Sequence, residues 1–338
     1  MFKRFFATLR PRRVPDWLHQ KLNSEFAKYP PDAQLASNSQ IARNAKKITE
    51  ALEIEAEKGC EDSRNLIEGI AEFRKPTSTA LPLTNVPVKD IRVTEYLSRI
   101  IATIFNPELR VAERLFFLRR KSHISNMSPH SDGAANGYEL ELTQLSGIIS
   151  DGSVSTYVMD ANDLHQRLSK KTQQILREPI FGYIKEGCTE CVDKSLLPLK
   201  LPIFYDGKDG ALNINLFYSS RNLLQYDETK TSFLEKQIKD AIEQIHDTID
   251  DLLREGKIEK FYIKEGEMLN LKNKATLHGI INESGLFDPY APFSQEEPAK
   301  RETHRGVLIV SQEDPTRSPN SPQFFNLTPS KTTSPNQI

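Results

Sequence analysis

The chain has 338 residues, of which 45 are Lys or Arg and 46 are Asp or Glu, so its formal net charge is −1 at pH 7. This length allows one large domain or two smaller ones with a substantial core. The balanced charge gives no global electrostatic argument for nucleic-acid binding. The longest apolar runs are far shorter than a membrane span, and three cysteines do not make a disulfide framework.

The N-terminal segment is basic and aromatic and has no acidic side chain in its first thirteen residues. It lacks the uninterrupted apolar core of a secretory signal. We therefore predict a mobile basic arm over residues 1–15 and a cytoplasmic protein. A transit peptide or a membrane-surface anchor is the alternative.

Residues 16–108 have the pattern of a helical region. Apolar side chains recur every three or four residues along residues 32–57 and again before Pro76, which is typical of amphipathic helices. Asp16 is the expected N-cap of the first helix, and a later helix is expected to begin at Thr94. Residues 77–88 are rich in Pro and Thr, and we expect a connection there rather than a strand.

The pattern changes at Leu109, where short alternating or β-branched stretches replace the helical spacing. Asp160 is expected to cap a helix over residues 161–177, and a long amphipathic helix is expected over residues 230–255, ended by Gly256. Short strands with polar turns are typical of β-sandwiches and barrels. The expected strands cover residues 115–118, 138–145, 148–149, 154–158, 199–205, 211–217, 261–263, 268–271 and 306–310.

Three residues from distant parts of the chain form a candidate metal site. His130 and Asp132 are two apart, and on an extended strand residues i and i+2 point to the same face. His278 could supply a third ligand from a second strand. Two histidines and one carboxylate, with the other positions open, form the facial triad of non-heme Fe(II) oxygenases. A His two residues before an Asp is common in hydrogen-bonded turns, so the prediction depends on all three residues.

The stretch from Gly266 to Gly279 carries a family resemblance. A glycine, an acidic residue and a short apolar strand are followed by Asn273, a basic residue, three further residues, His278 and a glycine. This resembles the pattern of the 2-oxoglutarate- and Fe(II)-dependent oxygenases related to clavaminate synthase and taurine dioxygenase. The resemblance implies that His278 is the distal iron ligand, together with His130 and Asp132.

A second stretch, residues 145–156, is similar to the family strand that ends in a 2-oxoglutarate-binding threonine. Thr156 lies 26 residues after His130, close to the family interval. The resemblance covers residues 109–312 and implies an α+β fold with a mainly β core, a distorted double-stranded β-helix (jelly roll) with flanking helices. Residues 16–312 would then form one oxygenase domain, with a helical part over 16–108 and the jelly-roll core over 109–312.

Two arginines near the last expected strand extend the resemblance. In the family an arginine at the start of this strand pairs with 2-oxoglutarate, and a second one four residues later often faces the substrate carboxylate. Arg301 and Arg305 have this spacing, and alternation would put both on one strand face with Thr303. The planar guanidinium suits a carboxylate. The interval from His278 is longer than in the family, so the two roles are partly interchangeable, and either arginine could be a surface charge.

The activity that the resemblance implies is oxidation by Fe(II), 2-oxoglutarate and O2. The cosubstrate is converted to succinate and CO2 while an unactivated C–H bond of a small carboxylate-bearing substrate is hydroxylated. The clavaminate synthase-like branch includes many hydroxylases of free or carrier-bound amino acids such as Arg, Lys and Asn. Residues 219–229 and 280–299 are expected to form loops over the substrate. Desaturation or cyclisation with the same cofactors, and a non-catalytic jelly-roll binding protein, are the alternatives.

Several remaining features receive structural interpretations. His165 and His246 fall on expected helices, where a polar-face role is expected. Cys188 and Cys191 have the spacing of half a zinc site, but a second pair of ligands is absent nearby, so we expect reduced thiols on a turn. Residues 313–338 are rich in Ser, Pro, Thr and Asn, which predicts a disordered tail.

Overall fold

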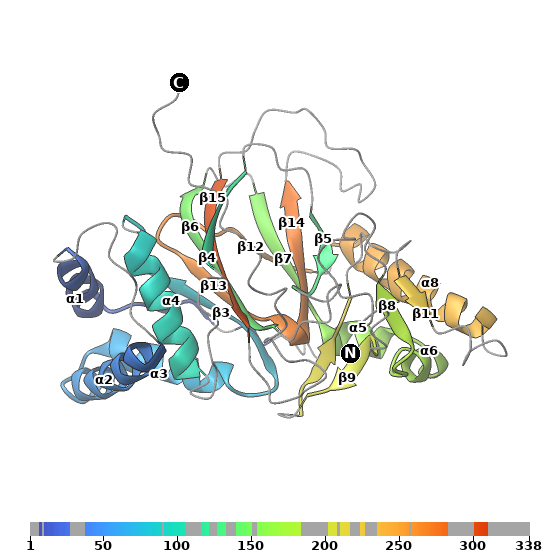
Figure 1. Cartoon of the computed structure of the whole chain (residues 1–338), viewed down its shortest axis with the longest axis horizontal. Helices are drawn as coiled ribbons and strands as arrows, with labels where there is room; N and C mark the ends of the chain where they lie inside the picture. The colour runs from blue at the N-terminus through green and yellow to red at the C-terminus, as the bar shows by residue number, and fades with distance from the viewer. Residues whose placement is uncertain are drawn as a thin grey trace, which may run out of the picture.

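The computed structural model has two main β-sheets at its centre and helices on the outer side of each sheet (Figure 1). The mixed α/β architecture expected from the sequence is confirmed. In the part of the chain that the structure describes, no helix is long and apolar enough to cross a membrane. The described residues are 7–8, 10–27, 38–89, 91–105, 116–121, 127–132, 140–150, 154–183, 202–207, 210–216, 224–226, 235–256, 258–282 and 301–309.

The larger sheet has seven strands in the order β1-β3-β13-β6-β15-β4, with β2 also paired to β3. Its long antiparallel pair is β6 (Leu140–Ser150) with β15 (Arg301–Ile309). On the other side of β6, β13 (Met268–Lys272) connects it to β3 (Ser78–Thr84), again antiparallel. The short strands are β1 (Ala7–Thr8), β2 (Arg12–Arg13) and β4 (Phe116–Lys121).

Four helices cover the outer face of the larger sheet (Figure 1). α4 (Ile91–Phe105) is buried along most of its length, because the sheet lies on one side of it and the other helices pack around it. The apolar core is continuous from these helices to Leu81, Leu142 and Met268 of the sheet. The other helices are α1 (Asp16–Phe26), α2 (Asn38–Glu57) and α3 (Glu61–Phe73).

The smaller sheet has four strands in the order β12-β7-β14-β5, all antiparallel to their neighbours. Its central strands are β7 (Val154–Asp160) and β14 (Thr276–Asn282). β12 (Glu259–Phe261) and β5 (Met127–His130) form its edges. Two hairpins accompany it, β9 (Phe204–Asp206) with β10 (Leu212–Ile214) and β8 (Phe181–Tyr183) with β11 (Leu224–Tyr226).

The outer face of the smaller sheet is covered by three further helices, α5 (Ala161–Arg167), α6 (Lys170–Ile175) and α8 (Glu235–Arg254) (Figure 1). Alternation along β7 divides its side chains between two cores. Tyr157 and Met159 pack with α5 and α8, whereas Val158 packs in an inner layer. That inner layer also takes Leu145, Leu269 and Leu271 from the larger sheet, so the two sheets share an apolar interior.

Two predictions for the N-terminal third are wrong. Residues 78–84 form strand β3 rather than a connection, and the mobile arm fails for Ala7–Thr8 and Arg12–Arg13, where β1 and β2 pair in parallel with β3. Pro82 misled the prediction, because proline is depleted in strands. It lies between the residues of β3 that pair with β1 and those that pair with β2, where the ladder on that side is interrupted. Arg13 is held by ion pairs with Asp16 and Asp62.

The start of one helix and the end of another also differ from prediction. α1 begins at Asp16 itself, whose carboxylate accepts hydrogen bonds from Arg13 and Asn85 instead of capping the helix. Asp160 does cap α5 as expected, but the helix stops at Arg167. Leu168 is extended, and the Ser169 hydroxyl caps the separate helix α6.

The two helical histidines are less exposed than predicted. His246 is fully buried on α8, and its Nδ1 lies 2.6 Å from the Ile242 carbonyl oxygen one turn earlier, so the polar-face prediction is wrong for it. His165 is half-buried on α5, edge-on to the Phe204 ring. The predictions for the Cys188–Cys191 turn, for residues 313–338 and for most of the loop over residues 280–299 lie outside the described residues.

Candidate metal centre

A strand pair places two histidines side by side. His130 is the last residue of β5, and its cross-strand partner in β14 is His278. Directly opposite residues of an antiparallel pair project to the same face of the sheet, and the centroids of these two rings are 4.6 Å apart. Each histidine is only 4% exposed. The second strand expected to carry His278 is therefore β14.

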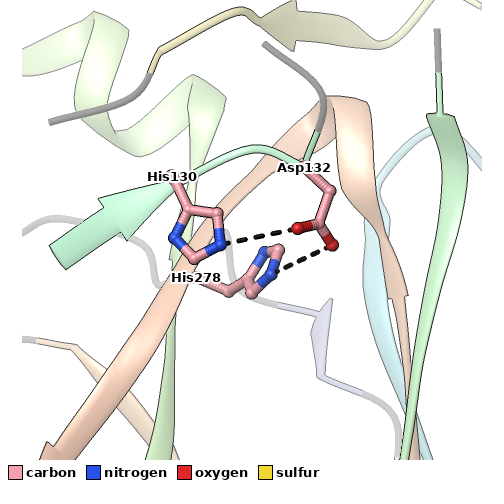
Figure 2. A group of neighbouring side chains, drawn as sticks. All are labelled: His130, Asp132 and His278. Atoms are coloured by element: carbon pink, nitrogen blue, oxygen red, sulfur yellow. Dashed lines mark ion pairs between the residues drawn. The ribbon is translucent and has the colours of Figure 1, made fainter. Parts of the chain in front are cut away.

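Asp132 reaches the histidines from a turn. β5 ends at His130, so the alternation that predicted a shared face for His130 and Asp132 does not extend to Asp132. Its carboxylate nevertheless faces both rings, with one oxygen directed toward each (Figure 2). Oδ1 is 3.5 Å from Nε2 of His130, and Oδ2 is 3.4 Å from Nε2 of His278. Potential ligand atoms of the three residues lie within 4.8 Å of one another.

Hydrogen bonds to three different segments explain how the chain turns between His130 and Asp132. His130 belongs to the β5–β14 ladder. The Ser131 N–H donates to the Leu216 carbonyl at 2.9 Å, and the Leu216 N–H donates back to the Ser131 hydroxyl at 3.3 Å. The Asp132 N–H donates to the side-chain oxygen of Asn273 at 2.7 Å. Each consecutive residue is thus attached to a different part of the fold.

Two residues that carried no functional prediction hold Asp132 in place. Asn273, in the short 3₁₀ helix η4 (Asn273–Ala275), also donates from Nδ2 to the Asp132 carbonyl at 2.9 Å. The Thr143 hydroxyl of β6 donates to Oδ2 of Asp132 at 2.6 Å. The sequence pattern includes Asn273 without giving it a role, and nothing in the sequence singles out Thr143.

The donor set fits a divalent transition metal. Two imidazoles and one carboxylate, all buried, are the residue types of the facial triad. The His–Asp separations of 3.4 and 3.5 Å exceed the roughly 2.7–2.9 Å of a charge-assisted hydrogen bond. Two ligand atoms bound at right angles, each about 2.1 Å from a metal, would be roughly 3 Å apart. The separations are therefore too long for charge-assisted hydrogen bonds, and the three groups are close enough to reach one ion.

The proposed cosubstrate threonine lies in the same sheet as the histidines. Thr156 of β7 is fully buried and pairs with Ile280, two residues along β14 from His278. Val158 is the direct partner of His278 and belongs to the inner layer between the sheets. Thr156 is two residues from Val158, so alternation puts it on that same inner face.

The two candidate arginines lie on β15. Arg305 pairs with Leu145 and Thr303 with Gly147 in the β6 ladder, whereas Arg301 pairs with Ser150. The register shift between Glu302 and Thr303 lies in the β6 ladder, where Ile148 is the extra residue, whereas the pairing of β15 with β4 is regular from Arg301 to Gly306. The backbone of β15 therefore keeps the alternation that would put both arginines on one strand face. The side chains of Arg301 and Arg305 lie outside the described part of the structure.

The chain shares its fold with non-heme iron oxygenases. The oxygenase OrfP, in complex with Fe, succinate and (3R,4R)-dihydroxy-L-Arg, matches 90% of this chain and 94% of its own, with a TM-score of 0.58 and 12% identity. OrfP with Fe and alpha-ketoglutaric acid matches with a TM-score of 0.57, also at 12% identity, over 90% of this chain and 95% of its own.

Asparagine oxygenase in complex with Fe(II), 2S,3S-3-hydroxyasparagine and succinate is similar to this chain over 89% of its length and 93% of the oxygenase, with a TM-score of 0.59 and 12% identity. At such low identity the likeness establishes the fold. No protein-family model matches the sequence, and no curated protein sequence matches it.

Proposed function

We propose that this protein is an Fe(II)- and 2-oxoglutarate-dependent dioxygenase that hydroxylates a small amino-acid-like substrate. The observation that carries the proposal is the buried group of His130, Asp132 and His278, whose ligand atoms lie within 4.8 Å of one another. The shared fold with non-heme iron oxygenases supports it independently of the residues at the site. Asp132 favours hydroxylation over halogenation, because halogenases of this type have a small residue at that position.

Each proposed site residue has a definite task. His130, Asp132 and His278 would hold Fe(II) and leave its remaining positions for cosubstrate and dioxygen. Thr156 would bind 2-oxoglutarate, and of Arg301 and Arg305 one would pair with the cosubstrate and the other with the substrate carboxylate. When bound, Fe(II) with 2-oxoglutarate supplies the activation of O2 needed to oxidise a C–H bond. The buried positions of the triad exclude bulk water from that reaction.

The substrate class follows from the related structures and from the two arginines. The complexes of OrfP contain hydroxylated L-Arg or L-canavanine, and that of asparagine oxygenase contains hydroxyasparagine. A second guanidinium near the site would suit the α-carboxylate of an amino acid. We propose a free or carrier-bound amino acid such as Arg, Lys or Asn.

The proposed function also implies a domain organisation for the chain. We propose that residues 16–312 form one oxygenase domain and that its two sheets form the distorted double-stranded β-helix of this enzyme class. The inner apolar layer that the two sheets share supports this arrangement. Location in the cytoplasm remains a prediction from the sequence.

A panel of amino acids tests the proposal. The purified protein is supplied with Fe(II), 2-oxoglutarate and air, and succinate and product masses are recorded for each amino acid. We expect substrate-dependent succinate and a product heavier by one oxygen. A product lighter by two hydrogens would indicate desaturation or cyclisation. The proposal would be contradicted if the wild-type protein formed no more succinate than the His278→Ala variant, both with every amino acid of the panel and without added substrate.

A further inference from the structure

Asp132 is the only one of the three proposed ligands that is not part of a β-ladder in the described chain. His130 and His278 are fixed relative to each other because they are partners in one strand pair. Asp132 lies two residues beyond the end of β5. Without other restraints, two main-chain torsions per residue would let its carboxylate move away from the histidines. Something else must set its position.

The side chain of Asn273 takes the place of a neighbouring strand. Its oxygen accepts from the Asp132 N–H at 2.7 Å, and its NH2 donates to the Asp132 carbonyl at 2.9 Å. These are the two bonds that a main-chain partner would make. Asn273 is 1% exposed and lies five residues before His278, on the segment that leads directly into β14. It therefore ties Asp132 to the same segment that carries the distal histidine.

Thr143 then restricts the carboxylate itself. Its hydroxyl, fully buried on β6, donates to Oδ2 of Asp132 at 2.6 Å. A short charge-assisted bond to one oxygen limits rotation of the carboxylate about its last side-chain bond. Thr143 belongs to the larger sheet, whereas the histidines belong to the smaller one. Asp132 is thus held from the larger sheet as well as from the segment that leads into β14.

We propose that Asn273 and Thr143 are positioning residues that orient Asp132 for metal binding, Asn273 through its main chain and Thr143 through its carboxylate. The inference rests on the proposed metal site. Partners that orient metal ligands commonly contribute about 10–100-fold to metal affinity. The consequence is a loss of affinity when either partner is removed, beyond any loss of stability.

The first test uses Thr143→Val, which keeps the shape of the side chain and removes the hydroxyl. The metal-free protein is titrated with Co(II) alone, and affinity and the visible spectrum of the bound ion are recorded together with thermal unfolding of the metal-free form. We expect about 10–100-fold weaker binding and an altered spectrum. Thr143→Ser keeps a hydroxyl at this position, and its Co(II) affinity should lie within about threefold of the wild-type value.

The matched control is Thr103→Val. Thr103 is also buried, and its hydroxyl donates to the Arg99 carbonyl at 2.8 Å within α4, away from Asp132. This variant loses a comparable hydrogen bond and should keep wild-type Co(II) affinity. A similar loss of affinity in both valine variants would overturn the positioning role.

Asn273→Ala and Asn270→Ala form a second matched pair. Asn270 is equally buried, accepts from Gln144 at 2.8 Å and donates to the Leu81 carbonyl at 3.0 Å, but it does not bond to Asp132. We expect weaker Co(II) binding for Asn273→Ala alone. If Asn273→Ala does not fold, the comparison at Thr143 decides the proposal.

A double-mutant cycle separates failure of this inference from failure of the proposed function. In an Asp132→Ala background, Thr143→Val should cause no further loss of Co(II) affinity, because its effect runs through the carboxylate. Wild-type protein that binds Co(II) no better than His278→Ala would contradict the metal site itself. Wild-type binding that Thr143→Val and Asn273→Ala leave unchanged would contradict only the positioning role.

Discussion

The two histidines of the site are held by main-chain pairing, so their side chains are expected to be separable from the fold. His130 and His278 face each other across the β5–β14 ladder, and the apolar layers on either side of that sheet are formed by other residues. Removing one imidazole leaves these layers intact. Substitution at either position should therefore report on metal binding rather than on folding.

We expect His130→Ala and His278→Ala each to abolish Fe(II) binding and turnover. The free energy of unfolding of the metal-free protein should fall by no more than about 1–3 kcal/mol, as for a typical buried substitution. Metal content after dialysis against Fe(II) without oxygen, together with denaturant unfolding, measures both. Substantial turnover by either variant would show that the ligand assignment is wrong.

The arginines of β15 are expected to divide between the two carboxylates. If Arg301 binds 2-oxoglutarate, Arg301→Ala should raise the apparent KM for 2-oxoglutarate, since losing a buried charge-assisted pair costs about 2–5 kcal/mol. Arg305→Ala should then weaken the amino-acid substrate and leave uncoupled succinate formation. Titration of each variant against both ligands decides the roles, and the opposite pattern would exchange them. If neither KM changes, both side chains lie outside the site.

The pKa of Asp160 gives a pH-dependent contribution to stability. Burial raises it from 3.8 to about 6, although hydrogen bonds from the backbone of Asn162 and Asp163 lower it. The folded protein thus holds this proton more tightly than the unfolded chain, and the free energy of unfolding falls as the pH rises from about 4 to about 6.

Asp160→Asn keeps a capping oxygen and removes the charge, so we expect the variant to be more stable at pH 7 by on the order of 2 kcal/mol. Its stability should also lose the part of the pH dependence that lies between about 4 and 6. Denaturant unfolding at pH 4.5 and pH 7 measures this. Asp160→Ala, which also removes the charge but loses the cap, is the control and should be about 1 kcal/mol less stable than Asp160→Asn. An unchanged pH dependence in Asp160→Asn would contradict the account.

At the scale of elements, one glycine allows the turn before β13 to pack against β6. A Cβ added at Gly147 would lie 2.2 Å from the main-chain oxygen of Lys264. The Gly147 N–H donates to the Glu267 carbonyl at 2.9 Å, and its own carbonyl accepts from the Gly266 N–H at 3.2 Å. This turn leads into β13, which is followed along the chain by Asn273 and His278. The packing of the turn against β6 therefore helps to position the segment that carries these two residues.

Gly147→Ala should therefore destabilise the protein by about 3 kcal/mol or more, because a backbone carbonyl must move. Gly69→Ala is the comparison: its Cβ would lie 2.6 Å from the Cγ of Arg12, which is part of a flexible side chain. Alanine is favoured over glycine in a helix by about 1 kcal/mol, which offsets part of the cost of moving Arg12, so we expect a smaller loss than at Gly147. Thermal unfolding of both variants measures the difference. Equal losses would contradict the assigned close approach.

At the scale of the whole molecule, the pattern of apolar residues predicted several elements. α8 and the strands β7 and β13 follow from spacing of apolar residues, and Gly256 has the positive φ expected after a helix. β3 was missed because its pairing with β13 is a long-range contact that outweighs the preference of Pro82. The break at Leu168 depends on Gln173, whose amide donates to the carbonyls of His165 and Leu168, and spacing does not reveal such a bond.

The sequence predicted that His130, Asp132 and His278 lie together, but it did not predict the residues that hold Asp132. His130, Asp132 and His278 could be selected because their residue types and order follow a family pattern. Strand alternation does not bring His130 and Asp132 together as predicted, since β5 ends at His130 and Asp132 is in a turn. Thr143 could not have been found, because its role comes from the approach of the larger sheet to that turn. Such contacts exist only once the two sheets have packed together.

The two sheets together make the proposed enzyme, since the histidines come from one and the residues that hold Asp132 from the other and from the segment between them. The most direct test of this enzyme is turnover under ¹⁸O2 with the amino acid that gives the most succinate. We predict one labelled oxygen atom in the hydroxylated amino acid and one in succinate, with both signals lost in His278→Ala. Succinate without label, or label that persists in His278→Ala, would contradict the account.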